Sequence, residues 1–187
     1  SISTEDADKS KNLAKYVNEA KGDIEVFVTG DIAGDATLQQ KPNVGVTITG
    51  NDKNYNGAIV IDGKSAGYDT ASMTIKGLNF SANTLSDDAF INLGKEGNNN
   101  TRYTRNVRVE GCTFSSTGDA IVAVKSYTGG DKYVSIIDCT VNEGVHSLAQ
   151  LTNVEEGLKF EGCVVAAKNG VNLNNTPTFE MNDCSFD

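Results

Sequence analysis

The chain has no tryptophan, two prolines, one histidine and no apolar run long enough to span a membrane. Its first residues do not form a signal peptide. Acidic residues (25) outnumber basic ones (16), and the resulting charge of −9 does not suit binding of nucleic acid by bulk electrostatics. No phosphate loop, zinc-ligand pattern or serine triad is present. We therefore expect neither insertion into a membrane through an apolar helix nor a nucleic-acid partner held by bulk charge.

What the chain does have is one short phrase that ends near a cysteine and recurs at intervals of 27, 24 and 21 residues. In each copy, apolar residues alternate with polar ones, and Gly or Asp precedes the cysteine. The four copies are Val107–Phe114, Val134–Val141, Leu158–Val165 and Phe179–Phe186. A phrase repeated at this period indicates a solenoid, in which equivalent residues stack from coil to coil.

The four cysteines allow two interpretations. Four cysteines in a secreted protein suggest two disulfides. Equivalent residues on stacked parallel strands lie about 4.8 Å apart, which is within disulfide range, but in-register β-carbons lie farther apart than a bridge prefers. We therefore expect reduced, buried thiols that pack as small core residues. The cysteines are Cys112, Cys139, Cys163 and Cys184.

A second repeated pattern lies between these phrases and predicts a further strand in every coil. Its copies are Ala58–Ile61, Ala89–Leu93, Ala120–Val124, Ser147–Leu151 and Gly170–Leu173. The cysteine phrase also has upstream copies without cysteine, at residues 46–50 and 73–80. Each coil therefore contains three short strands, two of them separated by a one-residue corner that suits a left-handed Gly or Asp.

This arrangement resembles the pectate-lyase-like right-handed parallel β-helix, and the resemblance covers residues 24–187. It implies an all-β solenoid of about six coils, with a ligand groove along one sheet bordered by the longer loops. Lyases, hydrolases, adhesins and phage spikes share this fold, so the fold does not define an activity.

The two ends are expected to differ. Four residues of the segment 1–23 share one helical face: Leu13, Tyr16, Val17 and Ala20. With Gly22 as C-cap, this segment is expected to be a capping helix on the first coil. The chain stops at Asp187 directly after a repeat phrase. We expect the protein to continue beyond it, or another chain to contact the uncapped last coil end to end.

The long loops, at residues 62–72, 94–106 and 125–133, carry tyrosines and two of the three arginines of the chain. Guanidinium groups pair with uronate carboxylates and tyrosine rings stack on pyranose faces, so we expect a polysaccharide or cell-surface glycan to bind here. The alternative is that these are solvated loop residues whose arginines pair with nearby carboxylates. The candidate binding residues are Tyr68, Arg102, Tyr103, Arg105, Tyr127 and Tyr133.

Asp88, Asp119 and His146 each precede the same ladder strand in three successive coils. This register resembles the polygalacturonase family, and the resemblance implies a carboxylic acid that protonates the leaving oxygen and a carboxylate that activates water. The family's paired aspartate is missing, because Gly118 precedes Asp119, and its Arg-Ile-Lys motif is replaced by Val-Asn-Leu at 171–173. The alternative is that these are turn residues bonded to the backbone.

No cofactor is predicted, since the oxygen-rich segment 50–57 lacks the acidic spacing of a Ca²⁺ loop. The leading hypothesis is a non-catalytic β-helix domain for adhesion or glycan binding, in a secreted or cell-surface protein whose leader has been removed. One alternative is a hydrolase or lyase acting on acidic polysaccharide, and another is a structural spacer. The shortening repeat intervals place the variable loops, and the expected site, around residues 62–133.

Overall fold

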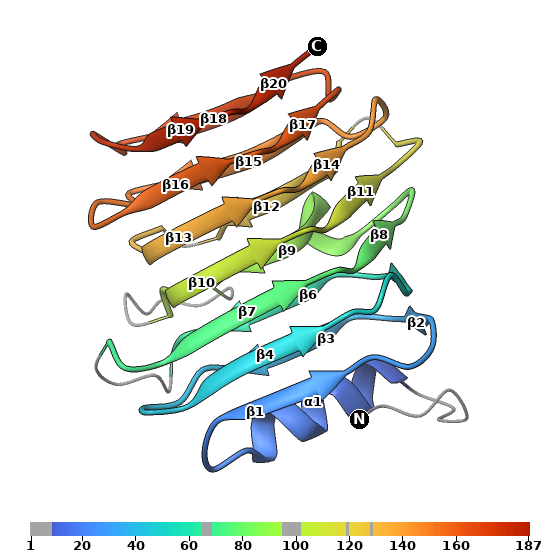
Figure 1. Ribbon diagram of the computed structural model, residues 1–187, viewed down its shortest axis with the longest axis vertical. Helices are drawn as coiled ribbons and strands as arrows, with labels where there is room; N and C mark the ends of the chain where they lie inside the picture. The colour runs from blue at the N-terminus through green and yellow to red at the C-terminus, as the bar shows by residue number, and fades with distance from the viewer. Residues whose placement is uncertain (1–8, 65–68, 95–101, 119, 128) are drawn as a thin grey trace.

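The computed structural model describes residues 9–64, 69–94, 102–118, 120–127 and 129–187. It is a parallel β-solenoid of about six turns, with three sheets and one N-terminal helix (Figure 1). The predicted fold class is therefore confirmed. Each turn passes from the first sheet to the second and then the third, and every strand pairs in parallel with its equivalents in the adjacent turns.

The strands of each sheet follow the sequence pattern. The first sheet contains β1 (Ile24–Phe27), β4 (Gly45–Thr49), β7 (Ser72–Lys76), β10 (Arg105–Glu110), β13 (Lys132–Ile137), β16 (Leu158–Glu161) and β19 (Glu180–Asn182). The second contains β2 (Ile32–Ala33), β5 (Asn54–Asn56), β8 (Asn79–Ser81), β11 (Thr113–Ser115), β14 (Thr140–Val141), β17 (Val164–Val165) and β20 (Ser185–Phe186). The third contains β3 (Ala36–Gln39), β6 (Ile59–Asp62), β9 (Ala89–Leu93), β12 (Val122–Ser126), β15 (Ser147–Thr152) and β18 (Val171–Asn174).

The corner between the first and second sheets is left-handed, as the sequence predicts for Gly and Asp. Gly111 has φ 59° and Asp138 has φ 52°. Gly50 is an exception: its φ is not positive, and Asn51 and Asp52 make the left-handed turn instead. Gly50 is needed for space, because a Cβ there would lie 2.5 Å from the carbonyl oxygen of Gly77. The prediction of a one-residue corner at Gly50 is therefore wrong.

The core contains a ladder of aromatic rings from successive turns. The ring centroids of Tyr55 and Phe80 lie 5.4 Å apart, and Phe80 stacks on Phe114 at 5.1 Å. Phe90, from the third sheet, reaches both phenylalanines of this ladder at 5.7 and 5.8 Å. Each fully buried phenylalanine contributes about 1.5–3 kcal/mol to stability, so this ladder is a major part of the core.

The cysteines form a second ladder, at the start of the second-sheet strands. All four are free thiols, three of them buried and Cys184 partly exposed. Their sulfurs lie near backbone carbonyls, as in the 3.4 Å contact from Cys139 to Ile137 and the 3.5 Å contact from Cys163 to Ile136. The expectation of free thiols that pack as buried core residues is confirmed for Cys112, Cys139 and Cys163, and it is wrong in its burial for Cys184.

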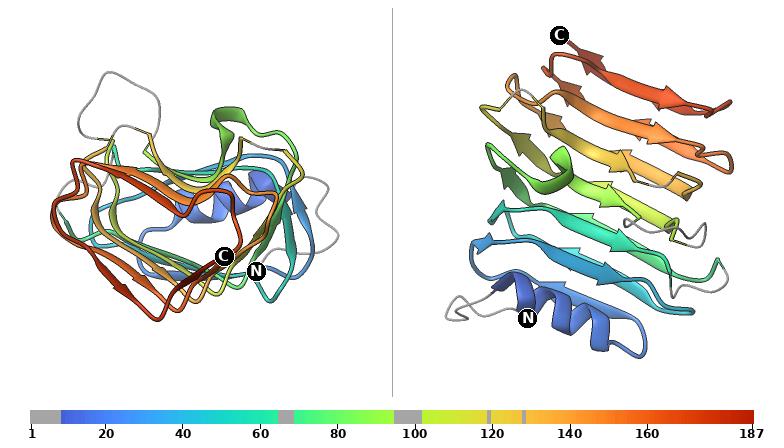
Figure 2. Two further views of the ribbon diagram at one scale, coloured as in Figure 1. Left: turned by 90° about the horizontal axis from the view of Figure 1, so that it is seen from above. Right: turned by 180° about the vertical axis from the view of Figure 1, so that it is seen from behind.

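Helix α1 (Lys9–Glu19) covers the first turn of the solenoid (Figure 2). Leu13 and Val17 are fully buried, and the Asn18 side chain bonds both the carbonyl of Thr37 and the amide of Gln39 on β3. The predicted helical face is wrong at Tyr16, whose side chain is 42% exposed. None of the helical segments in the described residues has the length and apolar character needed to cross a membrane.

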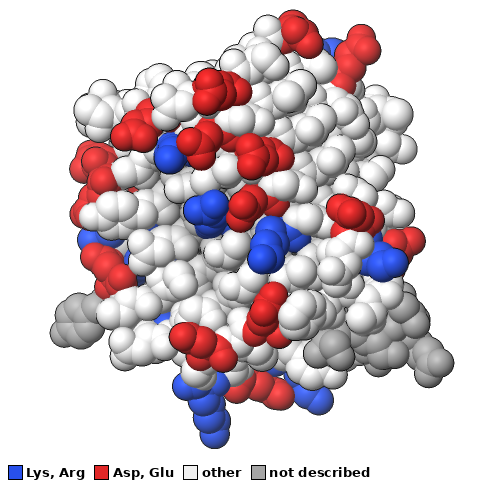
Figure 3. Space-filling view, in the orientation of Figure 1, with Lys and Arg blue, Asp and Glu red and all other residues white. Residues whose placement is uncertain are grey.

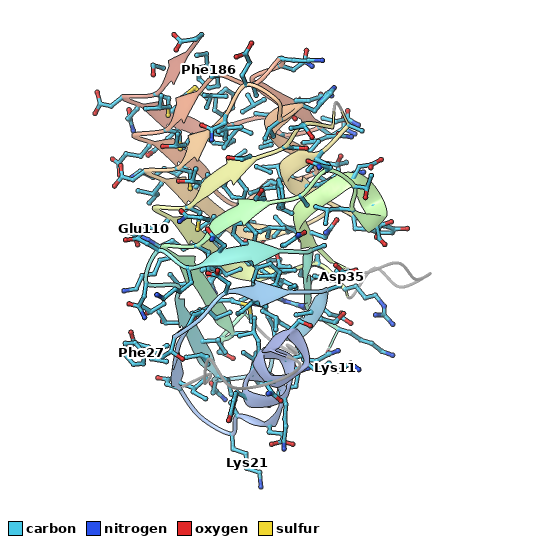
Figure 4. The ribbon with its side chains drawn as sticks, turned by 90° about the vertical axis from the view of Figure 1, so that its right-hand side faces the viewer. Lys11, Lys21, Phe27, Asp35, Glu110 and Phe186 are labelled. Carbon is cyan, nitrogen blue, oxygen red and sulfur yellow. The ribbon has the colours of Figure 1, made fainter. Side chains whose placement is uncertain are left out.

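The last turn exposes side chains that are buried in earlier turns. Phe186 continues the inward row of Phe114 and Val141, yet it is 42% exposed at the end opposite the helix (Figure 4). The end-to-end contact expected here stays a prediction, as does the domain boundary after residue 23.

The burial of the thiols predicts their order of reaction with a disulfide reagent. In the folded protein, Cys184 should react first, while the other three thiols react only as fast as the protein unfolds. The hydrogen bond with a neighbouring sulfur and then burial raise the pKa of Cys139 and Cys163, which lowers their thiolate fraction. Labelling followed by mass spectrometry would test this order. Rapid labelling of all four thiols under native conditions, or a fast phase that survives Cys184→Ser, would contradict it.

Candidate ligand-binding groove

The long loops leave the solenoid at one corner, where third-sheet strands end and first-sheet strands begin. We call this the loop corner: the described residues 40–44, 63–64, 69–71, 94, 102–104, 127, 129–131, 153–157 and 175–179. Beside it lies an unusual group of buried polar side chains, which includes Gln40, Asp62, Arg105 and Asp131. Buried polar groups are costly unless they are bonded, so their partners reveal what the corner does.

Arg105, which is 3% exposed, is held on all sides. The amide of Gln40 accepts from its backbone N–H at 2.9 Å and donates to its carbonyl at 2.7 Å. The guanidinium donates to the carbonyls of Gly63 (2.7 Å) and Tyr103 (2.8 Å) and lies 3.9 Å from the centre of the Tyr103 ring. This guanidinium joins two long loops to the coil and is not presented to a ligand.

The other arginines also pair with carboxylates. Arg102 donates to the buried carboxylate of Asp62 at 2.8 Å, and Arg108 lies 3.2 Å from Glu110 on the outer face of the first sheet. Figure 4 shows Glu110 projecting from this face. Arg105 also lies 3.7 Å from the carboxylate of Asp69, so each arginine has a carboxylate nearby, as the alternative interpretation expects, although the buried Arg105 is not a solvated loop residue.

Asp131 is the most buried carboxylate of the loop corner, with 1% of its surface exposed. It accepts hydrogen bonds from the backbone N–H of Thr104 (2.8 Å), from the hydroxyl of Thr104 (2.9 Å) and from the hydroxyl of Ser126 (3.0 Å). Burial raises the pKa of Asp131, and these hydrogen bonds oppose that shift. The carboxylate fixes the end of one loop against the next turn.

Lys132, at the start of β13, connects the loop corner to the outer surface. Its amine lies 3.2 Å from Asp69, 3.5 Å from Glu156 and 5.6 Å from the centre of the Tyr103 ring. The hydrogen bond to Asp69 raises the pKa of Lys132, so the amine stays charged at neutral pH. The residue that follows Lys132 in β13 lines a surface groove.

That residue is Tyr133, which has a left-handed backbone (φ 60°) and a side chain that is 48% exposed. Its ring lies against Gly157 of the next turn, since a Cβ at 157 would be 3.0 Å from the ring. Beyond Gly157 is a groove of about 420 Å³ across the starts of β13, β16 and β19. The groove is lined by Tyr133, Val134, Ser135, Glu156, Gly157, Leu158, Lys159, Thr178, Phe179 and Glu180.

Two of the three candidate catalytic residues, Asp88 and His146, are described, and they lie on different turns. Asp88 ends the 3₁₀ turn η1 (Ser86–Asp88), which projects beside the third sheet in Figure 2, and its carboxylate is exposed. His146 precedes β15 and contacts Ser147 and Asn169 through its ring nitrogens. Strand β12 separates β9 from β15, so the two backbones are two strand spacings, roughly 10 Å, apart. Asp119 lies outside the described residues.

The tyrosines predicted to bind ligand are dispersed. Tyr103 packs with Arg105 and Lys132, Tyr133 lines the groove, and Tyr127 is partly exposed after β12. Tyr68 lies outside the described residues. The sequence interpretation missed most of the groove, although Phe179 opens a repeat phrase that it had identified.

No protein-family model, curated protein or solved structure matches the chain significantly. The class of protein therefore rests on the geometry alone: a three-sheet parallel β-solenoid that carries a surface groove with two exposed aromatic rings.

The loop corner predicts a difference between two substitutions of Asp131. Asp131→Ala leaves the buried N–H of Thr104 without an acceptor and should lower the free energy of unfolding by about 1–3 kcal/mol. Asp131→Asn keeps one carbonyl oxygen for that N–H and should cost less. Urea denaturation would measure both. Equal losses in the two variants would show that the hydrogen bond to Thr104 is unimportant.

The same residue predicts a dependence on pH. Because burial raises the pKa of Asp131 in the folded state, the folded protein binds this proton more tightly than the unfolded chain. The contribution of this proton to the free energy of unfolding is fully present below the pKa that Asp131 has in the unfolded chain. It is lost as the pH rises through the higher pKa of the folded state. Relative to Asp131→Asn, the wild type should therefore lose stability across that window as pH rises. If the difference in free energy of unfolding between wild type and Asp131→Asn, measured with urea, stays constant from acidic to neutral pH, the raised pKa of Asp131 is contradicted.

Proposed function

We propose that this solenoid is a non-catalytic glycan-binding domain of a secreted or cell-surface protein, and that the glycan lies in the groove between Tyr133 and Phe179. The observation that carries the proposal is the pair of aromatic side chains, each 48% exposed, that line one groove. Large apolar side chains grouped at a surface hollow are typical of binding sites.

The other lining residues suit a sugar. Pyranose rings present an apolar face that stacks on an aromatic ring and a rim of hydroxyls that needs polar partners. Ser135 and Thr178 supply hydroxyls, Lys159 supplies a donor and Glu180 supplies acceptors at the edge of the groove. The volume is within the range of ordinary ligand sites, about 300–1,000 Å³.

The scaffold supports the proposal as well. The groove crosses three neighbouring strands whose backbones are hydrogen-bonded in register, so its residues are held before any ligand arrives. A preorganised surface loses little conformational entropy on binding. The proposed relation to pectate-lyase-like β-helices is consistent with a carbohydrate ligand, although that relation rests on the repeat pattern alone.

A carbohydrate-active enzyme is the second candidate, and Asp88 is the observation in its favour. Its carboxylate is exposed beside the third sheet, and η1 is tethered there by a 3.1 Å hydrogen bond from Lys125 to the carbonyl of Asp87. A hydrolase of this kind requires a second acid or base across the scissile bond. The sequence pattern groups Asp88 with Asp119 and His146. Of these two partners, His146 is the one among the described residues, and it lies two strands away from Asp88.

Incubation with polygalacturonate and related uronans tests the two candidates. For a non-catalytic domain we expect no new reducing ends and no ultraviolet absorbance from unsaturated products, with or without Ca²⁺. Product release that is abolished in Asp88→Asn, but retained in Asp87→Asn, would favour the enzyme and count against the leading proposal.

The binding proposal predicts that Tyr133→Ala weakens the affinity for a bound glycan by about tenfold, because the stacking surface is lost. Gly157→Ala should weaken it as well, since the added methyl displaces the ring. Glycan-array screening followed by calorimetry would measure both effects. Tyr16→Ala is the matched control, because Tyr16 is similarly exposed (42%) but lies on α1 at the far end of the molecule. Equal binding by Tyr133→Ala would refute the site.

A further inference from the structure

We infer that the groove between Tyr133 and Phe179 selects uncharged glycan chains and discriminates against uronans, an inference that rests on the proposed function. The sequence suggests the opposite, because arginines beside tyrosines suit an anionic sugar. Selectivity depends on which charges are still available to a ligand after the protein has paired its own groups.

The guanidinium groups already have partners: Arg108, whose strand position pairs with the groove residue Ser135, lies 3.2 Å from Glu110 on the outer face. Arg105 is buried against the carbonyls of Gly63 and Tyr103, and Arg102 is bonded to Asp62 at 2.8 Å. A uronate could recruit the Arg105 guanidinium only by breaking these buried interactions, which would leave polar groups without partners, and at Arg102 it would share the guanidinium with the Asp62 carboxylate. The loop corner therefore offers no ready guanidinium to a carboxylate.

The two lysines near the groove are also neutralised. Lys132 lies between Asp69 and Glu156, and Lys159 lies 3.6 Å from Glu161. Each cation thus has at least one carboxylate beside it within the described structure.

The groove itself carries an excess of carboxylates. Its lining contains Glu156 and Glu180 but only one cation, Lys159. Glu180 is exposed, and no ion pair to it is found among the described residues. Toward the C-terminal end of the first sheet, where the groove lies, the exposed charges in Figure 3 are mainly acidic.

The field of the whole protein acts in the same direction. With a net charge of −9, the protein repels a polyanionic chain as it approaches. At the groove, a uronate carboxylate would meet the carboxylates of Glu156 and Glu180, and the one lining cation, Lys159, already lies beside Glu161, so the like charges cost affinity. A neutral hexose chain has no such cost, and its hydroxyls can donate to the same carboxylates.

The experiment compares each neutral chain with a charged copy of itself. Cello-, manno- and galacto-oligosaccharides are each paired with the same chain oxidised at C6, which changes the hydroxymethyl group to a carboxylate and leaves the pyranose ring in place. We expect the oxidised chain to bind about tenfold more weakly by calorimetry at low salt, and we expect this ratio to shrink at high salt as the charges are screened.

Glu180→Gln tests the origin of the discrimination. Removing this carboxylate should reduce, several-fold, the ratio of the affinity for the neutral chain to the affinity for the oxidised chain. The matched control is Glu143→Gln, which makes the same change of charge at an exposed position in the turn after β14, away from the groove. The control should leave the ratio as it is in the wild type.

The outcomes separate the two proposals. Tighter or equal binding of the oxidised chains would overturn the selectivity while glycan binding stands. A ratio that Glu180→Gln and Glu143→Gln change equally would also overturn it, because the groove would then contribute nothing beyond net charge. Absence of binding by every chain, neutral or oxidised, would overturn the proposed function itself and the selectivity with it.

Discussion

In-register stacking of parallel strands is the constraint on which the rest of this structure depends. Because adjacent turns are only about 4.8 Å apart, every inward side chain meets its own equivalent above and below. A residue type that packs well once can therefore be used again, as in the Phe80–Phe114 stack and the thiols that follow it. The interior of the solenoid is therefore a set of stacked rows of equivalent residues, which pack against one another in a single core.

The same constraint makes the exterior variable at one place. Where a long loop leaves the stack at the loop corner, the turns on either side of it must still bond to each other. Gln40 and Arg105, 65 residues apart, provide this closure by bonding across the turn that contains β6. The buried arginine is thus part of the scaffold that permits a long loop, and its charge is used internally.

This division explains which features could be predicted. The periods of alternation and the cysteine phrase are properties of each coil alone, so the strands and the reduced thiols follow from the sequence. The helical face at Tyr16 was wrong because the first turn covers only part of α1, and the corner at Gly50 was wrong because contact with Gly77 decides it. The partners that Arg102 and Arg105 find in Asp62 and Gly63 belong to a different turn, which no local pattern encodes.

The groove shows the same limit. The repeat intervals pointed to residues 62–133, whereas the groove extends from Tyr133 to Glu180. Its members are separated by a whole turn each, and they meet because the register places Gly157 beside the Tyr133 ring. The sequence by itself determined the solenoid, since one repeated phrase can bury its apolar face only by stacking on itself. Only the tertiary structure decided which side chains share a surface and which charges remain open to a ligand, because both depend on contacts between turns.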